Sequence, residues 1–376
     1  MKALADRKEI LKFYRGKRVL VTGNTGFKGS WLTFMLKEAG SIVMGYSLPP
    51  EPGRSLYEMA GLSGKGCIEQ VFGDVRDLKG MEKAFLDFKP EIVFHLAAQP
   101  IVRRSYREPV ETFDTNIMGT VNVLECVRLN PSVRSFLNVT TDKVYLNREG
   151  NTGFKETDPL DGYDPYSNSK SCSELVTHSY ASSFFEDSDT AISTARAGNV
   201  IGGGDFSEDR IIPDCVRCVE KAYLEGTGYE ADITVRNPHS IRPYQHVLEP
   251  LFAYLMIAKA QYEDKNCSGW YNVGPDDGDC INTGDLVSCF CEKWNHAGKG
   301  MPRAVWHHRT ESSAPHEAGY LKLDCSKLKS VFGWRPCWNI EKALEETVIF
   351  TNRMLVGDDI RKEMKREIEE MEKGCE

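Results

Sequence analysis

Residues 18–29 read RVLVTGNTGFKG, and this stretch decides the fold. Its first five residues form a short apolar run that is typical of a buried β-strand. Glycines follow at positions 23, 26 and 29, and over 30–39 the apolar residues recur with helical spacing. This order predicts a phosphate-binding loop, because glycines let the backbone approach a pyrophosphate and the helix N-terminus offers free N–H groups. An ordinary turn between strand and helix is the alternative interpretation.

The pattern of strand and helix repeats through the first half of the chain. Further strands are predicted over 41–47, before Gly73, and over 91–96, 135–140 and 191–197. Helices are predicted over 78–88, 110–129 and 167–185. Strands that alternate with helices form βαβ units and hence a parallel sheet covered on both faces. The sequence therefore predicts a doubly wound α/β fold of the Rossmann type.

The domain organisation follows from a change in this pattern after residue 197. We predict three parts: a dinucleotide-binding domain over 16–197 with returns near 233–265, a smaller mixed substrate lobe over 198–232 and 266–355, and a charged C-terminal helix over 356–376. Within the last part, residues 358–373 alternate acidic and basic side chains, which predicts a solvent-exposed helix.

The composition limits the partners. The 376 residues carry a formal net charge of −8, which excludes a general nucleic-acid binder but leaves room for a local arginine cluster that binds an anion. No run has the length of a signal peptide or of a membrane span, so we expect a cytoplasmic protein without a membrane partner. The 12 cysteines are scattered as expected for reduced thiols, and Cys215 and Cys218 share a helix face, which favours packed thiols over a metal site.

Two groups of polar residues predict chemistry at the carboxyl edge of the sheet. Tyr166 and Lys170 open the helix that follows the 135–140 strand and, at i and i+4, share one face. A phenol with a pKa of about 10 is a poor base at neutral pH, so a nearby cation has to favour the phenolate. A pair of surface side chains is the alternative.

The second group is Thr141, Asp142 and Lys143, directly after the same strand. Open α/β sheets bind ligands at this edge. Strict alternation would point Asp142 away from both neighbours, so all three face one ligand only if the chain leaves the strand here. The alternative is an ordinary turn with Asp142 as its cap.

The type of dinucleotide stays open on the residues alone. The second strand ends at Ser47 without the Asp or Glu that holds an adenosine 2′-hydroxyl, and Arg54 lies near enough to suggest a 2′-phosphate. NAD and NADP are therefore both possible cofactors. Asp74, at the end of the next strand, either accepts a hydrogen bond from adenine or caps the GDVRD turn.

Seven blocks of the chain resemble, in order, those of the nucleotide-sugar 4,6-dehydratases of the extended short-chain dehydrogenase/reductase family. They read GNTGFKGSWL, HLAAQPIVRRSY, TTDKVY, PYSNSK, RAGNVIGGGD, RNPHSIRPYQHVLEP and PHEAGYLKLDCSK. The resemblance runs from about residue 16 to 344, and the blocks over 199–205 and 236–250 are typical of the subgroup that acts on CDP-glucose. Asn24 departs from the histidine of that subgroup, and Thr141 stands where serine is also common.

The resemblance implies that the chain dehydrates CDP-D-glucose with NAD. Tyr166 takes the proton of the sugar 4-hydroxyl while C4 gives hydride to NAD, Thr141 binds O4, and Lys170 binds the nicotinamide ribose. Asp142 then protonates the departing 6-hydroxyl and Lys143 removes the C5 proton, where relatives that act on dTDP-glucose use an Asp-Glu pair. Hydride returns to C6 and gives CDP-4-dehydro-6-deoxy-D-glucose.

Three alternatives stay open: a nucleotide-sugar 4-epimerase, a 4,6-dehydratase for another nucleotide sugar, and a non-catalytic regulator that senses nucleotide sugars. An epimerase needs the Tyr-Lys pair but no acid–base pair for elimination. Asp142 and Lys143 therefore favour dehydration.

The resemblance also implies the contact residues. For the cofactor they are Gly23, Asn24, Thr25, Gly26, Phe27, Gly29, Ser47, Asp74, Val75, Leu96, Ala97, Ala98, Gln99, Thr140, Tyr166 and Lys170. For the substrate they are Gln99, Arg103, Asn199, Arg210, Arg236 and Arg242, the guanidinium groups being suited to bidentate binding of phosphate. His95 is expected to be a structural hydrogen bonder. Similar enzymes pair through the helices over 110–129 and 167–185, which implies a homodimer or a dimer of dimers.

Overall fold

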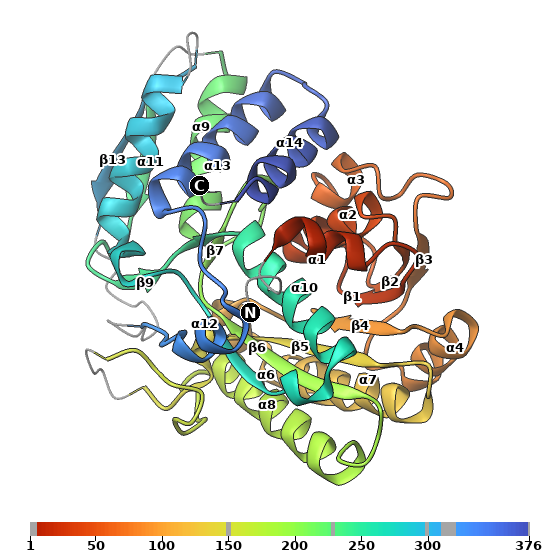
Figure 1. Ribbon diagram of the computed structural model, residues 1–376. Coiled ribbons are helices and arrows are strands. Elements are labelled where there is room, and N and C mark those ends of the chain that lie inside the picture. The colour runs from red at the N-terminus through yellow and green to blue at the C-terminus, as the bar shows by residue number, and fades with distance from the viewer. Residues whose placement is uncertain (1–5, 148–151, 227–229, 298–300, 310–320, 375–376) are drawn as a thin grey trace.

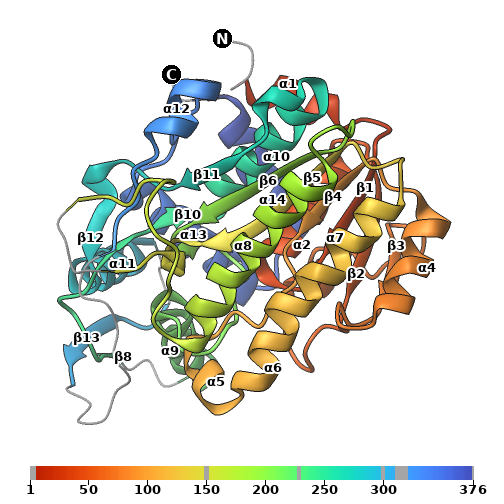
Figure 2. The same ribbon diagram turned by 90° about the horizontal axis from the view of Figure 1, so that it is seen from below.

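The central feature of the computed structural model is a parallel sheet of seven strands (Figures 1 and 2). The structure describes residues 6–147, 152–226, 230–297, 301–309 and 321–374, so the 315–320 part of the last resembling block lies outside it. In sheet order the strands are β11 (Trp270–Val273), β6 (Ala191–Ala197), β5 (Ser135–Thr141), β4 (Ile92–His95), β1 (Arg18–Thr22), β2 (Ile42–Ser47) and β3 (Glu69–Phe72). The predicted doubly wound α/β fold is confirmed.

Helices cover both faces of this sheet. On one face lie α1 (Arg7–Phe13), α2 (Phe27–Glu38) and α10 (Leu248–Glu263), and on the other α4 (Leu78–Phe88), α7 (Gly119–Leu129) and α8 (Pro165–Phe184). Short helices α3 (Leu56–Met59) and α5 (Val102–Arg107) lie in the connections. Every residue of β5 and β6 is buried, as expected for strands that carry helices on both sides.

At the carboxyl edge of the sheet, β5 extends beyond the end of its neighbour β4. His95, the last residue of β4, pairs with Asn138, whereas β5 continues to Thr141 and still pairs there with Ala197 of β6. The polar residues that follow Thr141 therefore lie above the carboxyl edge of the sheet, close to the connections after β1 and β4.

The helix predicted over 110–129 changes its winding midway. The structure divides it into α6 (Pro109–Phe113), a π-helical turn (Asp114–Met118) and α7. Asn116 is buried in the wide turn, where its Oδ1 accepts from the Gln99 N–H at 2.8 Å and its Nδ2 donates to Ser169 Oγ at 2.8 Å. The turn thereby ties the loop after β4 to α8.

A second hydrophobic core lies beside the sheet domain. Its strands are β7 (Val200–Ile201), β8 (Ala231–Val235), β9 (Ile241–Pro243), β10 (Gln245–His246), β12 (Cys280–Asn282) and β13 (Ala304–His308), and its larger helices are α9 (Ile211–Leu224), α11 (Thr283–Ala297) and α13 (Ile340–Leu355). The helix α12 (Ser326–Phe332) packs next to β11. Within the described residues, no helix is both long and apolar enough to cross a membrane.

The prediction of a solvent-exposed C-terminal helix is wrong. The helix α14 (Ile360–Glu372) buries Ile360, Met364, Ile368 and Met371 in the main core beside α1. These residues form an apolar stripe at helical spacing, which the alternating charges between them conceal in the sequence.

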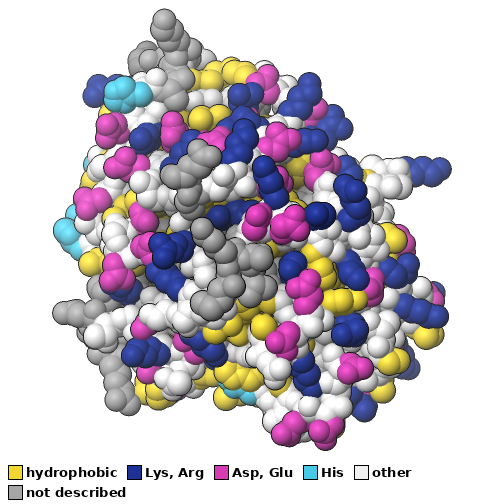
Figure 3. Space-filling view, in the orientation of Figure 1, with side chains coloured by type: hydrophobic (Ala, Val, Ile, Leu, Met, Phe, Trp, Pro, Cys, Tyr) yellow, Lys and Arg dark blue, Asp and Glu magenta, His cyan; other side chains and the backbone are white. Residues whose placement is uncertain are grey.

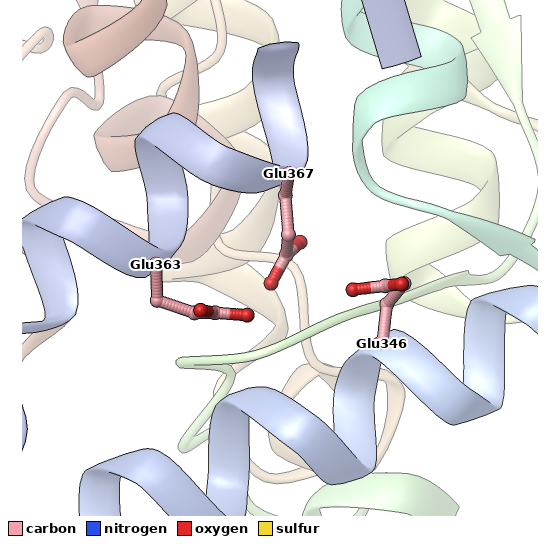
Figure 4. A group of neighbouring side chains, drawn as sticks. All are labelled: Glu346, Glu363 and Glu367. Carbon is pink, nitrogen blue, oxygen red and sulfur yellow. The ribbon is translucent and has the colours of Figure 1, made fainter. Parts of the chain in front are cut away.

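Two carboxylates of α14 and one of α13 lie close together between these helices. Glu363 and Glu367 point toward Glu346 of α13 (Figure 4), and all three are buried. Arg366 donates to Glu363 at 2.6 Å and also contacts Glu346, while Lys342 Nζ lies 2.6 Å from Glu346 Oε1. Two of the three charges are therefore neutralised by cations from the same two helices.

Glu367 has no such cation. Among the described residues neither of its carboxyl oxygens has a hydrogen-bond partner, and His246 Nε2 of β10 lies 3.4 Å from Oε2. Burial lowers the pKa of His246 to about 3, so its imidazole is neutral. Burial and the carboxylates of Glu346 and Glu363 raise the pKa of Glu367 well above its ordinary value, which favours the neutral, protonated carboxyl.

The buried carboxyl predicts a pH-dependent stability. Its pKa is higher in the folded than in the unfolded chain, where it is about 4.3, so folding binds a proton and stability falls as the pH rises above that value. The substitution Glu367→Gln mimics the protonated form. We expect its gain in free energy of unfolding over the wild type, measured by urea titration, to increase from about pH 5 to about pH 8.

The exposed Glu369 on the same helix provides the matched control, and Glu369→Gln should show no such pH-dependent gain. A difference between Glu367→Gln and the wild type that stays constant with pH contradicts the protonated carboxyl.

Candidate active site

The chain leaves the sheet directly after Thr141. A 3-10 helix, Asp142–Val144, begins there, and Ser171 of α8 donates to the Val144 carbonyl at 2.7 Å. The condition under which Thr141, Asp142 and Lys143 can face one ligand is therefore met. Because of this turn, Asp142 Oδ1 accepts hydrogen bonds both from Thr141 Oγ1 at 3.0 Å and from Lys143 Nζ at 3.1 Å.

Asp142 is the buried centre of this turn. Its side chain is fully buried, whereas Lys143 remains partly exposed. Its second oxygen, Oδ2, has no hydrogen-bond partner among the described residues and faces the backbone of Gly198. Lys143 Nζ also donates to Asn199 Oδ1 at 3.2 Å, so the predicted substrate residue Asn199 joins the site through Lys143.

The helix α8 carries Tyr166 and Lys170 to the same place. Its first turn is fixed by Asp164, whose side chain accepts from the Ser167 N–H at 3.0 Å, and by a proline at the first helical position. Tyr166 shares a side-chain hydrogen bond with Thr141. Lys170 Nζ donates to the Val139 carbonyl at 3.2 Å. The predicted catalytic residues therefore meet at one edge of the sheet.

Burial governs the charges of this pair. It raises the pKa of Tyr166 to about 12, although the hydrogen bond with Thr141 and the charge of Arg210 oppose the shift. It also lowers the pKa of Lys170 to about 8. Without a cofactor the cost of burying a phenolate outweighs the nearby cations, and the expectation that Lys170 and a positive nicotinamide ring together favour the phenolate stays a prediction.

A buried ion pair holds α8 on the sheet. Arg196 of β6 donates to Glu174 of α8 at 2.8 Å, and neither side chain is exposed. Thr194 donates to the same carboxylate at 2.8 Å, the Thr140 hydroxyl donates to its other oxygen, and Arg196 donates to Tyr145 Oη at 2.9 Å. Thr140, expected beside the cofactor, therefore turns its hydroxyl toward α8.

The glycine loop after β1 forms a backbone cradle. Gly23 has φ +71°, and a Cβ there would lie 2.7 Å from the Ala97 nitrogen. A Cβ on Gly29 would lie 2.1 Å from the Gly23 carbonyl oxygen. Gly26 precedes α2, whose first turn has no side-chain cap. The open N–H groups and the absence of side chains fit the pyrophosphate of a dinucleotide.

The remaining predicted cofactor residues lie along the carboxyl ends of the strands. Thr25 and Phe27 follow β1, Val75 follows β3, and Leu96, Ala97 and Ala98 follow β4. Asn24 and Ser47 bond to each other, since the Ser47 hydroxyl donates to Asn24 Oδ1 at 2.9 Å, and both are buried. Asn24 Nδ2 donates to Gln70 at 2.7 Å. These two side chains lock the loop onto β2 and β3.

The hydrogen bonds of Asp74 favour the alternative in which it caps the turn. It accepts from the Arg76 N–H at 2.9 Å and from Arg76 Nη2 at 2.6 Å, and this hydrogen bonding lowers its pKa. Arg54, the candidate for a 2′-phosphate, contacts Glu220 of α9.

Gln99 and His95 are both held by internal hydrogen bonds. The Gln99 amide donates to Thr112 Oγ1 at 2.9 Å, so its side chain is held within the chain, and its contacts with cofactor and substrate stay a prediction. His95 contacts Thr22 Oγ1 at 2.8 Å and Thr120 Oγ1 at 3.1 Å, and burial lowers its pKa to about 3. The expected structural role of His95 is confirmed.

The predicted substrate arginines come from four places in the fold. Arg103 of α5 and Arg236, which follows β8, both lie near Asp209, at 3.7 and 3.5 Å. Arg210 lies 3.6 Å from Asp205. These guanidinium groups are partly exposed. Buried Arg242 of β9 donates instead to the Ile241 carbonyl at 2.9 Å.

Comparison with known proteins identifies the family. A family model described as GDP-mannose 4,6 dehydratase matches residues 20–347. The chain belongs to this family. The CDP-glucose 4,6-dehydratase of Salmonella typhimurium is 44% identical over 363 residues, which cover 95% of this chain and 96% of that protein. The dTDP-glucose 4,6-dehydratase of Xanthomonas campestris is 27% identical and covers 88% of this chain and 91% of its own. The predicted resemblance to nucleotide-sugar 4,6-dehydratases is confirmed.

Solved structures agree with this dehydratase fold. The UDP-glucose 4-epimerase of Thermus thermophilus in complex with NAD has a TM-score of 0.71 and 26% identity, covering 89% of this chain and 99% of that chain. The dTDP-glucose 4,6-dehydratase of Bacillus anthracis in complex with NAD has a TM-score of 0.69, covering 92% of this chain and 100% of that chain. Its identity of 20% supports the fold alone.

One residue of the dehydratase site was missed by the sequence interpretation. Lys28, the second residue of α2, interacts electrostatically with four site residues: Asp142, Lys143, Lys170 and Arg210. Burial and the three cations lower its pKa to about 7. The signal in the sequence was a lysine inside the glycine loop, directly before Gly29.

The ion pair under α8 predicts a large effect of one substitution. Glu174→Gln preserves the shape of the side chain but leaves the Arg196 charge buried and uncompensated. We expect the free energy of unfolding, from urea titration, to fall by about 3–5 kcal/mol.

The double variant Glu174→Met/Arg196→Met removes both charges and should recover a large part of that loss. A loss below about 1 kcal/mol for Glu174→Gln contradicts the anchoring role, since exposed pairs contribute that little.

Proposed function

We propose that this chain is an NAD-dependent CDP-D-glucose 4,6-dehydratase, a hydro-lyase that forms CDP-4-dehydro-6-deoxy-D-glucose and water. The observation that carries the proposal is the turn after β5, which gathers Thr141, Asp142 and Lys143 beside Tyr166. The 44% identity to a CDP-glucose 4,6-dehydratase over 95% of the chain supports the substrate.

The glycine cradle supports NAD as the cofactor. The loop over 23–29 and the first turn of α2 would hold its pyrophosphate. Bound NAD supplies a hydride acceptor and later returns that hydride. Lys170, which already lies at the carboxyl edge of β5, would hold the nicotinamide ribose. Arg54, the candidate for a 2′-phosphate, already pairs with Glu220 of α9, so it does not argue for NADP.

Oxidation at C4 begins with Tyr166. Its phenolic oxygen takes the proton of the sugar 4-hydroxyl while C4 loses hydride, and Thr141 holds O4 by a hydrogen bond. Because burial raises the pKa of Tyr166 to about 12, the phenolate needs positive charge beside it. Arg210 supplies part of this charge.

Dehydration then depends on Asp142 and Lys143. The new 4-ketone acidifies the C5 proton, Lys143 removes it, the electrons form the C5–C6 double bond, and O6 leaves as water with a proton from Asp142. A base must be neutral and an acid must carry its proton. The mechanism therefore requires that the proton shared along the 3.1 Å hydrogen bond between Lys143 and Asp142 lies on Asp142 when C5 is deprotonated. Hydride then returns to C6 and a proton to C5.

The acid–base pair predicts a selective defect. Lys143→Ala should leave oxidation at C4 detectable as absorbance of the reduced cofactor, while formation of the 4-keto-6-deoxy sugar falls by at least about a hundredfold. Product analysis by mass spectrometry, with CDP-, dTDP-, UDP- and GDP-glucose as substrates, measures this and the base preference together.

The exposed Lys155 serves as the control, and Lys155→Ala should keep full turnover. Full turnover of CDP-glucose by Lys143→Ala removes Lys143 from the mechanism. Formation of an epimer without loss of water by the wild type overturns the dehydratase in favour of an epimerase, and binding without turnover of any substrate favours a regulator.

The same proposal includes a homodimer, or a dimer of dimers, through the helices α6, α7 and α8. These helices lie side by side on the outer side of the sheet (Figure 2). Their outward-facing residues include exposed large apolar side chains, namely Val110, Met118, Leu129, Leu175 and Phe184. Such a surface favours pairing with a second copy, because it would otherwise remain in contact with water.

This assembly predicts that Leu175→Glu gives monomers, since a carboxylate would be buried at the centre of the contact. Light scattering after size-exclusion chromatography measures the mass. Leu224→Glu, at an exposed leucine on α9, is the control and should not change it. A monomeric wild type contradicts the assembly.

A further inference from the structure

Among the described residues the Lys28 amine has no hydrogen-bond or ion-pair partner, and it lies close enough to the catalytic groups for their charges to act on it. The residue is half-buried. Its position in the first turn of α2 is unfavourable for a positive charge, because the helix dipole is positive there. A lysine in this environment lowers the stability of the fold unless an anion binds to it.

The charges around Lys28 point to a ligand with more than one negative charge. Lys143, Lys170 and Arg210 repel it and Asp142 attracts it, but Asp142 already accepts a hydrogen bond from Lys143. The protein as a whole carries −8, and acidic and basic side chains are interspersed over the face in Figure 3. Several cationic side chains therefore gather locally around Lys28, which suits the binding of a polyanion.

Two diphosphates enter this site if the proposed function, on which this inference rests, is right. The pyrophosphate of the cofactor is matched by the N–H groups of the glycine loop. Of the charged groups that act on Lys28, Asp142 and Lys143 act on the sugar in the proposed reaction, Arg210 is a predicted substrate residue, and Lys170 would hold the nicotinamide ribose. We propose that Lys28 binds the diphosphate of the nucleotide sugar and thereby positions the sugar beside Asp142 and Lys143.

If Lys28 binds the diphosphate, ligand binding changes the protonation of its amine. Burial and neighbouring cations hold the pKa of free Lys28 at about 7, so above neutral pH the amine is largely neutral. A diphosphate with two negative charges favours the ammonium. Ligand binding must therefore take up a proton at about pH 8, and the affinity must fall as the pH rises above about 7.

The test uses the NAD-loaded protein and CDP-glycerol, a diphosphate ester that has no hexose to oxidise and no phosphate proton that titrates near neutral pH. Calorimetric titration at about pH 8 in two buffers of different ionisation enthalpy gives affinity and proton uptake. The wild type should take up close to one proton per ligand. Lys28→Met should bind about tenfold to hundredfold more weakly without this uptake.

Two further variants separate charge from structure. Lys28→Arg keeps a cation that does not titrate, so it should retain affinity within a few-fold and lose the proton uptake. Lys37→Met, at the other end of α2, should behave like the wild type in both measurements. The affinity for NAD should stay within about twofold in all variants.

The outcomes distinguish the inference from the proposed function. A wild type that does not bind the cytidine diphosphate ester overturns the proposed substrate. A wild type that binds it, together with equal affinity and proton uptake in Lys28→Met, overturns the role of Lys28 alone. Lys28→Met that loses affinity for NAD but not for the ester also overturns it, because the lysine then serves the cofactor.

Discussion

The buried ion pair between Glu174 and Arg196 is the constraint on which the catalytic geometry depends. Both side chains lie where β5, β6 and α8 meet, and desolvation of two charges is tolerated only because Thr140, Thr194 and Tyr145 complete their hydrogen bonds. The same pair fixes the rotation and height of α8 on the sheet. Tyr166 and Lys170 take their positions from that helix, so their approach to the turn after β5 follows from the ion pair beneath them.

Positive charge is the second organising feature of the site. Burial works against the reactive form of Tyr166, since it raises the pKa to about 12, and it lowers the pKa of Lys28 and Lys170 toward neutrality. The chain alone therefore favours the protonated phenol of Tyr166 and brings the titration of the Lys28 and Lys170 amines close to neutral pH. A charged ligand that binds beside these groups shifts their pKa values. Ligand binding and protonation are therefore coupled in this site.

Sequence reasoning succeeded where function is set by local pattern. The glycine loop was predicted, and the break after Thr141 was foreseen as the condition for a site there, because a strand, a turn and a helix follow from neighbouring residues alone. Sequence reasoning failed where the partner of a side chain is set by residues that are distant in the sequence. Gln99 and Thr140 turn to internal partners, and Lys28 reaches the site through the tertiary arrangement of α2. The burial of the last helix was missed because its charges conceal a narrow apolar stripe.

That last helix has a consequence for how the molecule acquires its structure. Met364 and Met371 of α14 share one core with Ile10 and Leu11 of α1, although more than 340 residues separate them. Contacts between segments so distant in sequence require the closure of a very long loop and form late in folding. The helix α1 therefore cannot complete its packing until α14 has been synthesised, and its apolar face stays accessible to chaperones for that time.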